Sequence, residues 1–238
     1  MAPLAAPGEP LPTLVLPGLH GGTDQLDEFA RLAPEPFQPI LLSLPESTAD
    51  YDQLTEHFAE IVAQHPACAL VAESFSGPLA VKLAARLPER VKLLVLVATF
   101  ARAPRPLLVR WLPWRWLFRL PLPMWAMRLF LTGRKMSADR AARLRADIRQ
   151  MSARMFAARF REISRVDVRA ELARIQAHRV YLLGANDWIV PASAAADFAD
   201  ASPPWPVIRV PGGHMLLEAQ PAACWDALAK VFGGASGS

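Results

Sequence analysis

Three polar residues stand where apolar segments of the sequence end, and their types allow nucleophilic catalysis. Ser74 follows the apolar segment 68–72, and Asp187 and His214 follow two later apolar segments. A serine hydroxyl attacks a carbonyl carbon when a histidine takes its proton and a carboxylate orients the imidazole and stabilises its charged form. The order along the chain therefore predicts a nucleophile at Ser74, an acid at Asp187 and a base at His214.

The residues around Ser74 suit a tight turn between a strand and a helix. Such a turn needs small residues two positions before and after the serine, because the backbones nearly touch there. Ala72 and Ser76 meet this need where glycine is usual. The turn would project the hydroxyl above the sheet edge, at a helix N-terminus that favours developing negative charge. A serine before a helix is more often an N-cap, so the argument depends on Asp187 and His214.

A glycine-rich segment, residues 16–22, directly follows another apolar segment near the N-terminus. We expect the backbone amides of Leu19 and Phe75 to form an oxyanion hole for a tetrahedral intermediate. Phosphate binding is the competing use of such a loop, but neither G-x-x-x-x-G-K-[ST] nor G-x-G-x-x-G is present. His20 is expected to line the mouth of the pocket, with acid–base chemistry as the alternative. Trp188, which follows the predicted acid, is expected to form a wall of the pocket.

Short apolar segments that alternate with helical patterns must bring these residues together. The apolar segments predict strands at residues 13–16, 39–42, 68–72, 91–98, 179–183 and 207–210. Between them, the pattern predicts helices at residues 51–65, 78–87, 192–200 and 215–232. This alternation indicates an α/β fold, with a mostly parallel central sheet and helices on both faces. Residues that follow the carboxyl ends of parallel strands meet at one sheet edge, which would place the three predicted catalytic residues together.

One long segment, residues 101–174, interrupts this alternation. It carries 18 arginine and lysine residues against five acidic residues, a net charge of +13, while the rest of the chain carries −9. Its second half has an apolar stripe at helical spacing, which predicts helical structure over 139–175. We therefore expect residues 1–100 and 175–232 to form the sheet domain. Residues 101–174 would form an inserted basic helical cap, and residues 233–238 a disordered tail.

The sequence resembles the α/β-hydrolase superfamily, in particular its small carboxylesterase-like members that carry a cap. The resemblance extends from about residue 13 to residue 232, and four motifs carry it in family order: LVLPGLHGG, LVAESFSGPLA, YLLGANDWIVP and VPGGHMLLEAQP. It implies the family's nucleophile, acid and base at Ser74, Asp187 and His214. It also implies the family's oxyanion hole at the amides of Leu19 and Phe75.

Three features depart from the family pattern. Ala72 and Ser76 replace glycine around the nucleophile, with Gly77 one position late. Pro17-Gly18 replaces the usual His-Gly of the oxyanion turn. The family's first two strands are missing, so a compact sheet of about six strands is expected.

The resemblance implies a serine hydrolase that cleaves carboxylic esters through an acyl-enzyme. Aromatic residues in the cap segment suggest a medium or long apolar acyl group. The alternatives are an acyltransferase, a membrane-associated lipase-like enzyme and a cofactor-free perhydrolase, which share the same three residues. A non-catalytic binding protein on a hydrolase scaffold is the alternative from another class. A haloalkane dehalogenase is disfavoured, because its nucleophile would be an aspartate.

The basic segment 101–174 has three interpretations. It is a solvated helical face, a docking surface for an acidic carrier or anionic substrate, or a contact surface for anionic lipid. The lipid interpretation depends on interleaved tryptophan and arginine residues: Trp111, Trp114, Trp116, Trp125, Arg110, Arg115, Arg119 and Arg128. The expected partner is thus a small-molecule or carrier-bound acyl ester. Nucleic acid is not expected, because no nucleic-acid motif is present.

Composition excludes several other classes. Cys68 and Cys224 are too few for a disulfide framework or a multi-cysteine metal site, and no His, Cys, Asp and Glu cluster has metal-ligand spacing. No uncharged apolar segment reaches the length of a membrane span, about 18–20 residues. The start of the chain, MAPLAAPGEPLP, lacks the basic residues of a signal peptide. We therefore expect a cytoplasmic protein with two buried free thiols and with neither metal nor cofactor.

Overall fold

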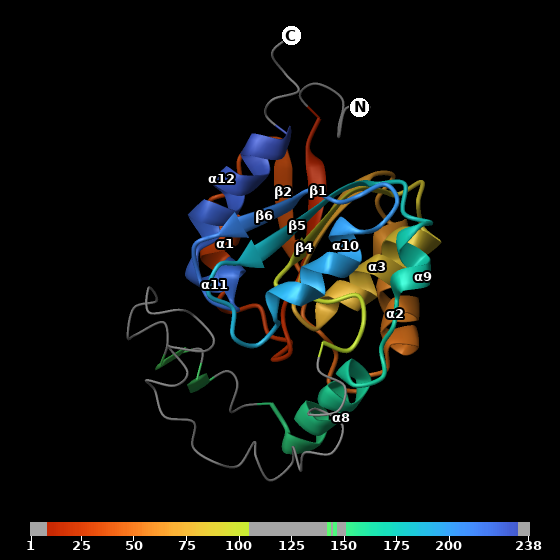
Figure 1. The fold of residues 1–238 in the computed structure, drawn as a ribbon, viewed down its shortest axis with the longest axis vertical. Coiled ribbons are helices and arrows are strands. Elements are labelled where there is room, and N and C mark those ends of the chain that lie inside the picture. The colour runs from red at the N-terminus through yellow and green to blue at the C-terminus, as the bar shows by residue number, and fades with distance from the viewer. Residues whose placement is uncertain (1–8, 105–141, 144, 147–150, 233–238) are drawn as a thin grey trace.

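The structure, a computed structural model, describes residues 9–104, 142–143, 145–146 and 151–232 (Figure 1). Within them, six strands form one parallel sheet in the order β2-β1-β3-β4-β5-β6. The strands are β1 (Leu11–Leu16), β2 (Phe37–Leu41), β3 (Cys68–Glu73), β4 (Val91–Val97), β5 (His178–Gly184) and β6 (Val207–Val210). The prediction of about six mostly parallel strands is confirmed, and the strand ends lie within two residues of their predicted positions.

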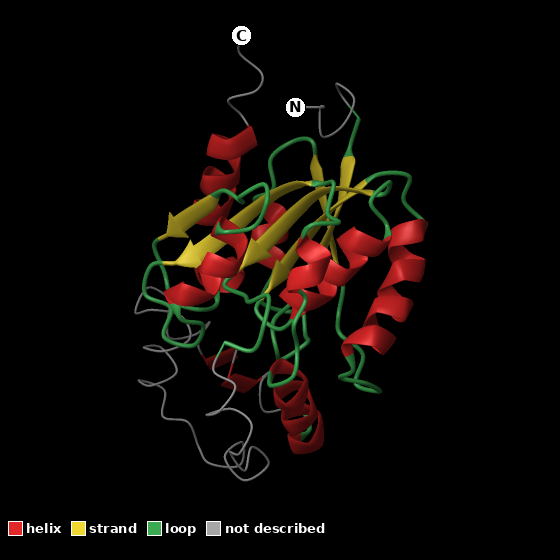
Figure 2. Cartoon of the chain, turned by 45° about the vertical axis from the view of Figure 1, so that its right-hand side comes forward, coloured by secondary structure: helices red, strands yellow, loops and turns green. Residues whose placement is uncertain are grey.

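Helices cover both faces of this sheet, as Figure 1 and Figure 2 show. The described helices are α1 (Asp27–Arg31), α2 (Tyr51–Ala63), α3 (Ser76–Arg86), α8 (Ala153–Ile163), α9 (Arg169–Leu172), the 3-10 helix η2 (Ala192–Ala195), α10 (Ala196–Ala199), α11 (Leu216–Ala219) and α12 (Pro221–Phe232). Helix α8 lies beyond one edge of the sheet and not on a face (Figure 1). One buried apolar cluster joins the sheet to α2, α3, α9 and α10, and a second joins it to α1, α11 and α12. Because both faces are covered, a central strand such as β3 is buried along its whole length.

Helix α2 begins and ends where its sequence dictates. The carboxylate of Asp50, just before the helix, accepts the backbone N–H groups of Asp52 and Gln53 at 2.9 Å each. These two amides have no partner within the helix, so the cap stabilises its first turn. Pro66 stops any continuation at the other end. The cap also places Tyr51 at the first helical position, where its hydroxyl donates to the Phe75 carbonyl at 2.8 Å.

Two helical predictions need correction. The helical pattern over 139–175 is interrupted within the described residues, because the Ser152 hydroxyl accepts the N–H of Met155 at 3.0 Å and so begins α8 anew. The single helix predicted over 215–232 is two helices, α11 and α12. Pro221 separates them, since it has no N–H to donate and keeps the residue before it out of the helical conformation.

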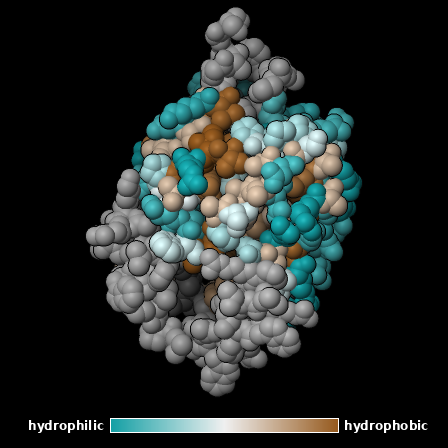
Figure 3. Space-filling view, in the orientation of Figure 1, coloured by the Kyte–Doolittle hydropathy of each residue, from teal (hydrophilic) through white to brown (hydrophobic). Residues whose placement is uncertain are grey.

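The described surface mixes hydrophilic and hydrophobic residues on the face drawn in Figure 3. Its exposed large apolar side chains are those of Ile40, Trp188 and Ile189. None of the described helices is both long and apolar enough to cross a bilayer. The tryptophan and arginine residues of the lipid interpretation, all between residues 105 and 141, lie outside the described residues, as does the tail 233–238.

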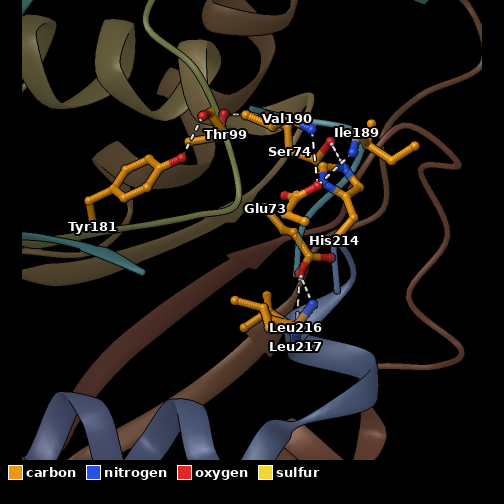
Figure 4. A network of polar contacts seen from close by, with 10 residues as sticks. Glu73, Ser74, Thr99, Tyr181, Ile189, Val190, His214, Leu216 and Leu217 are labelled. Carbon is orange, nitrogen blue, oxygen red and sulfur yellow. Dashed lines mark hydrogen bonds and ion pairs between the residues drawn. The ribbon is translucent and has the colours of Figure 1, made fainter. Parts of the chain in front are cut away.

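Two buried carboxyl groups stand near the sheet edge at which the predicted catalytic residues meet. Glu73, the last residue of β3, is 1% exposed, and Glu218 of α11 is 0% exposed. One Glu73 oxygen accepts the N–H groups of Leu216 and Leu217 at 2.8 and 3.0 Å (Figure 4). Glu73 therefore ties the end of β3 to the start of α11. No described donor reaches its other oxygen or either oxygen of Glu218.

The environment of Glu73 favours its protonated form. Burial raises the pKa of Glu73 well above its ordinary value of 4.5, and the nearby Glu218 carboxyl raises it further. A proton held by Glu73 can be shared with Glu218, which gives a partner to the second oxygen of Glu73 and to one oxygen of Glu218. The predicted free thiol of Cys224 is buried nearby, and burial together with the two carboxyls raises its pKa as well. Cys68 is also a buried free thiol, as predicted.

We expect Glu73→Gln to flatten the pH dependence of stability. The folded protein holds the Glu73 proton more tightly than the unfolded chain does, so the free energy of unfolding falls as pH rises above 4.5 toward the folded-state pKa. One such proton gives a slope of at most about 1.4 kcal/mol per pH unit. Glutamine keeps the acceptor for Leu216 and Leu217 but has no proton to lose.

Denaturant unfolding at several pH values above 4.5 measures this slope. Glu89→Gln, on the exposed surface, is the matched control and should keep the wild-type slope. A Glu73→Gln protein with the same pH slope as the wild type would contradict the raised pKa.

Candidate active site

Ser74 stands in the turn between β3 and α3 with a left-handed backbone. Its φ is 54°, a conformation that a non-glycine residue keeps only when its surroundings hold it. Its N–H donates to the Val97 carbonyl at 2.9 Å, and its own carbonyl accepts the N–H of Gly77 at 3.1 Å and the Thr99 hydroxyl. Phe75, rather than Ser74, is the N-cap of α3. The serine therefore does not serve as the helix cap, which was the alternative use of this residue.

The small residues that follow Ser74 are required by close contacts. A Cβ on Gly77 would collide with the Thr99 side chain, so the glycine is needed at this position. Ser76 occupies the position at which the family usually has glycine, and its buried hydroxyl donates to the Pro17 carbonyl. This bond joins the turn to the glycine-rich segment after β1. Ser76 and Gly77, which depart from the family pattern, therefore preserve the tight turn at Ser74.

The structure brings Ser74, Asp187 and His214 together in one hydrogen-bonded row, of which Figure 4 labels Ser74 and His214. Ser74 Oγ lies 2.8 Å from His214 Nε2, and His214 Nδ1 lies 2.8 Å from Asp187 Oδ2. Because the carboxylate accepts the proton of Nδ1, Nε2 presents its lone pair to the serine hydroxyl. The Ser74 and His214 residues are only 8% and 5% exposed. The imidazole is therefore arranged to take the hydroxyl proton.

Backbone amides hold the carboxylate of Asp187 in this position. Its Oδ1 accepts the N–H groups of Ile189 and Val190 at 2.8 and 3.0 Å, which leaves Oδ2 for the histidine. Gly184, at the end of β5, allows the loop that carries Asp187 to approach the loop that carries His214, because a Cβ there would collide with the Gly213 carbonyl. Two oxygens with separate partners fix the orientation of the carboxylate.

The segment after β1 lies against Ser74, as an oxyanion hole requires. A Cβ on Gly18 would lie 3.6 Å from Ser74 Cβ. The N–H of Leu19 shares its peptide group with the Gly18 carbonyl, which accepts the N–H of Gly21 at 3.0 Å. The N–H of Phe75 shares its peptide group with the Ser74 carbonyl, which accepts the Gly77 N–H and the Thr99 hydroxyl. A hydrogen bond to the carbonyl polarises a peptide group and strengthens its N–H as a donor.

Two buried residues that the sequence did not single out hold Leu19 and Phe75. Arg159 of α8 is 1% exposed and donates through Nη1 to the Leu19 carbonyl at 2.6 Å. Tyr51 stacks on Phe75 with ring centroids 4.9 Å apart and donates to its carbonyl. Burial lowers the pKa of Arg159 to about 10, so the guanidinium is still charged at neutral pH. Helical spacing is the one feature of the sequence that marks Arg159 as buried, because it lies four residues after buried Met155 on the apolar stripe.

The two residues predicted to line the pocket have different surroundings. His20 is half-buried beside Gly18 and Gly22, and its Nε2 has no hydrogen-bond partner among the described residues. Trp188 is 62% exposed, so it does not form the packed wall that the sequence predicted. The loop folds its backbone toward Asp187 through the two amides after Trp188, and the indole is left at the surface.

Comparison with known proteins places this geometry in a family. Residues 42–206 match the family model described as serine aminopeptidase, S33. A hydrolase from Pseudomonas aeruginosa PA01 is 20% identical, with a TM-score of 0.75 over 96% of this chain and 91% of that chain. A structure from work on carboxylesterases of Nitrososphaera gargenis is 14% identical, with a TM-score of 0.77 over 94% and 90%. A thermophilic esterase from Thermogutta terrifontis is 18% identical, with a TM-score of 0.77 over 95% and 91%.

No curated protein matches the chain significantly. The family model nevertheless covers more than half of the chain and includes both Ser74 and Asp187, with His214 shortly after its end. The parallel sheet with helices on both faces agrees with the similar solved structures. The chain therefore belongs to the serine aminopeptidase S33 family, within the α/β-hydrolase superfamily.

Proposed function

We propose that the protein is a serine hydrolase that cleaves carboxylic esters through an acyl-enzyme. The observation that carries the proposal is the row of hydrogen bonds from Ser74 through His214 to Asp187, with 2.8 Å at each step. The left-handed turn presents the serine hydroxyl to the imidazole, and the carboxylate sets the tautomer. This arrangement supplies a nucleophile, a base and an orienting acid.

The first half of the reaction forms the acyl-enzyme. His214 Nε2 takes the proton of Ser74 Oγ while Oγ forms a bond to the ester carbonyl carbon. The N–H groups of Leu19 and Phe75 stabilise the negative carbonyl oxygen of the tetrahedral intermediate. His214 then gives its proton to the alcohol oxygen as the carbon–oxygen bond breaks, and the alcohol leaves.

The second half hydrolyses the acyl-enzyme with the same groups. A water molecule attacks the acyl carbon and gives a proton to His214, and the same amides hold the oxyanion. The proton then passes to Ser74 Oγ as its bond to the acyl carbon breaks, so the acid leaves and the enzyme is restored. Asp187 stabilises the imidazolium in both halves without itself taking a proton.

Esters are proposed as substrates in preference to peptides. Similar structures are named for esterase or carboxylesterase activity, whereas the family description names an aminopeptidase. An aminopeptidase must bind a free α-ammonium group, for which a carboxylate is the natural partner. Of the described carboxyl groups next to the nucleophile, Asp187 is engaged by His214, and Glu73 is bonded to backbone amides in an environment that favours its protonated form. The described site therefore supports ester cleavage better.

We further propose that residues 101–174 form a cap over the site and select a medium or long apolar acyl group. Helix α8 supports the first part, because Arg159 reaches the carbonyls of Leu19 and Pro45, in the loops that follow β1 and β2. The aromatic composition of the segment supports the second part: it includes Trp111, Trp114, Trp116 and Trp125.

Ser74→Ala should abolish both ester hydrolysis and covalent labelling by a fluorophosphonate. The substitution removes the nucleophile, so kcat should fall by about 10⁴-fold or more. Ser193→Ala, an exposed serine on η2, is the matched control and should retain both activities. A wild-type protein that is not labelled would favour a non-catalytic binding protein on this scaffold.

Asp187→Asn should lower kcat by about 10³–10⁴-fold with little effect on folding. The N–H groups of Ile189 and Val190 will retain the amide oxygen at the Oδ1 position, so the amide NH₂ will face His214 Nδ1. The histidine then carries its proton on Nε2 and cannot accept one from Ser74. Steady-state rates and thermal unfolding measure the two effects, and a kcat within tenfold of the wild type would exclude the role of Asp187.

A panel of p-nitrophenyl esters with acyl chains of about two to about twelve carbons tests the substrate proposal. We expect kcat/KM to rise with chain length to a maximum in the middle or upper part of this range. An aminoacyl p-nitroanilide, measured beside them, should be cleaved far more slowly. Faster cleavage of the anilide would identify an aminopeptidase, and a maximum at the shortest ester would exclude a long acyl pocket.

A further inference from the structure

We propose that Arg159 is a positioning residue for the oxyanion hole, through which helix α8 holds the peptide segment of Leu19 in its catalytic conformation. The inference rests on the proposed function and adds to it a residue that lies outside the sheet domain. It concerns a side chain that does not touch the reacting atoms and acts through the backbone of Leu19.

The contacts of Arg159 converge on the two residues whose amides would hold the oxyanion. Nη1 donates to the Leu19 carbonyl at 2.6 Å and lies 3.7 Å from the Met151 sulfur. Nη2 donates to the Pro45 carbonyl at 3.2 Å. The guanidinium carbon lies 5.7 Å from the centroid of the Phe75 ring, in cation–π contact. A single cation thus touches both Leu19 and Phe75.

The glycine-rich segment is built to admit this guanidinium. Gly21 has a φ of +80°, and a Cβ there would lie 2.5 Å from Nη1 and 3.0 Å from Nη2 of Arg159. The N–H of Gly21 closes a turn onto the Gly18 carbonyl at 3.0 Å, and its own carbonyl accepts the N–H of Leu44 at 2.9 Å. Leu19 lies inside this turn. Its backbone is therefore held by the turn on one side and by Arg159 on the other.

A role in packing alone does not explain a charged residue at this position. Arg159 is buried, its Nε has no hydrogen-bond partner among the described residues, and its described hydrogen bonds go to backbone carbonyls and a thioether sulfur. The charge of Glu46 favours the charged form of Arg159, but no described hydrogen bond joins the two. Burial of a cation without a hydrogen-bonded carboxylate is unfavourable, and an apolar side chain would fill the same space at less cost. The positive charge stands instead beside the peptide segment at which negative charge develops during the reaction.

The consequence for catalysis is preorganisation of the amides. The hydrogen bond to the Leu19 carbonyl restrains the backbone of Leu19, so that its N–H direction is set before substrate binds. Donors fixed in this way stabilise the transition state without having to reorganise, and loss of one such donor lowers kcat by about 10²–10³-fold. Loss of the support should have a smaller effect, because the amide itself remains.

The test compares Arg159→Met and Arg159→Lys with Arg161→Met, an exposed arginine on the same helix. Fluorophosphonate titration counts active sites, so kcat is expressed per labelled site. Arg159→Met should lower kcat about 10- to 100-fold with KM within about twofold. The affinity of an alkylboronic acid, whose tetrahedral adduct places an oxygen in the oxyanion hole, should fall in parallel. Arg159→Lys should recover part of both losses, and Arg161→Met should match the wild type.

A purely structural role gives a different result and would overturn the proposal. In that case Arg159→Met lowers the melting temperature and the labelled fraction, while kcat per labelled site and boronate affinity stay at wild-type values. If Arg159→Met does not fold, Arg159→Lys carries the test with Arg161→Lys as its control, and wild-type kcat per labelled site and boronate affinity in Arg159→Lys would overturn the proposal. Failure of the proposed function is distinguishable, since wild-type protein would then neither be labelled nor cleave esters.

Discussion

The left-handed backbone of Ser74 is the constraint on which the rest of this sheet edge depends. Such a conformation costs about 1–3 kcal/mol at a non-glycine residue, so neighbouring residues must impose it. The end of β4 does so: Val97 accepts the Ser74 N–H, and Thr99 donates to its carbonyl. Thr99 is held in turn by the Tyr181 hydroxyl at 2.7 Å, and it follows Ala98, which is also left-handed at a φ of 46°. Three neighbouring strands thus cooperate to expose one hydroxyl.

Buried polar groups orient the loops that follow the parallel strands. The strands bring their carboxyl ends to one edge, but they do not orient the loops that follow them. Glu73 orients the start of α11 after the histidine loop, and Arg159 orients the loop after β1. Each satisfies backbone groups that the sheet leaves without partners, and each is unfavourable to bury unless those bonds form. The apolar clusters on both faces of the sheet supply stabilisation that offsets the cost of burying Glu73 and Arg159.

The fold and the three residues of the hydrogen-bonded row could be predicted because both depend on short-range patterns. Apolar segments that alternate with helices define a parallel sheet, and a residue just after a strand must lie at its edge. Arg159 could not be predicted in this way, since its partners Leu19 and Pro45 lie 140 and 114 residues away in the sequence. Among 18 basic residues in its segment, only its spacing separated it from surface arginines.

Two other features near the site also have physical causes that the sequence does not show. Gly77 stands one position later than the family's glycine, and it lies where the Thr99 side chain leaves no room for a Cβ. Trp188 was expected to form a wall of the pocket because it directly follows the predicted acid. The turn that directs the next two amides at Asp187 leaves it at the surface instead. In both cases the decisive contact comes from a loop whose conformation has no sequence periodicity.

The contact between Arg159 and the Leu19 carbonyl also limits how freely this scaffold can be recombined. Insertions between strands of a common sheet are often regarded as interchangeable modules, which evolution or a designer can swap to change specificity. Here the segment between β4 and β5 contributes a cation to the loop after β1. A replacement segment would have to bring a matching donor to the same carbonyl, so the two regions cannot be exchanged independently of each other.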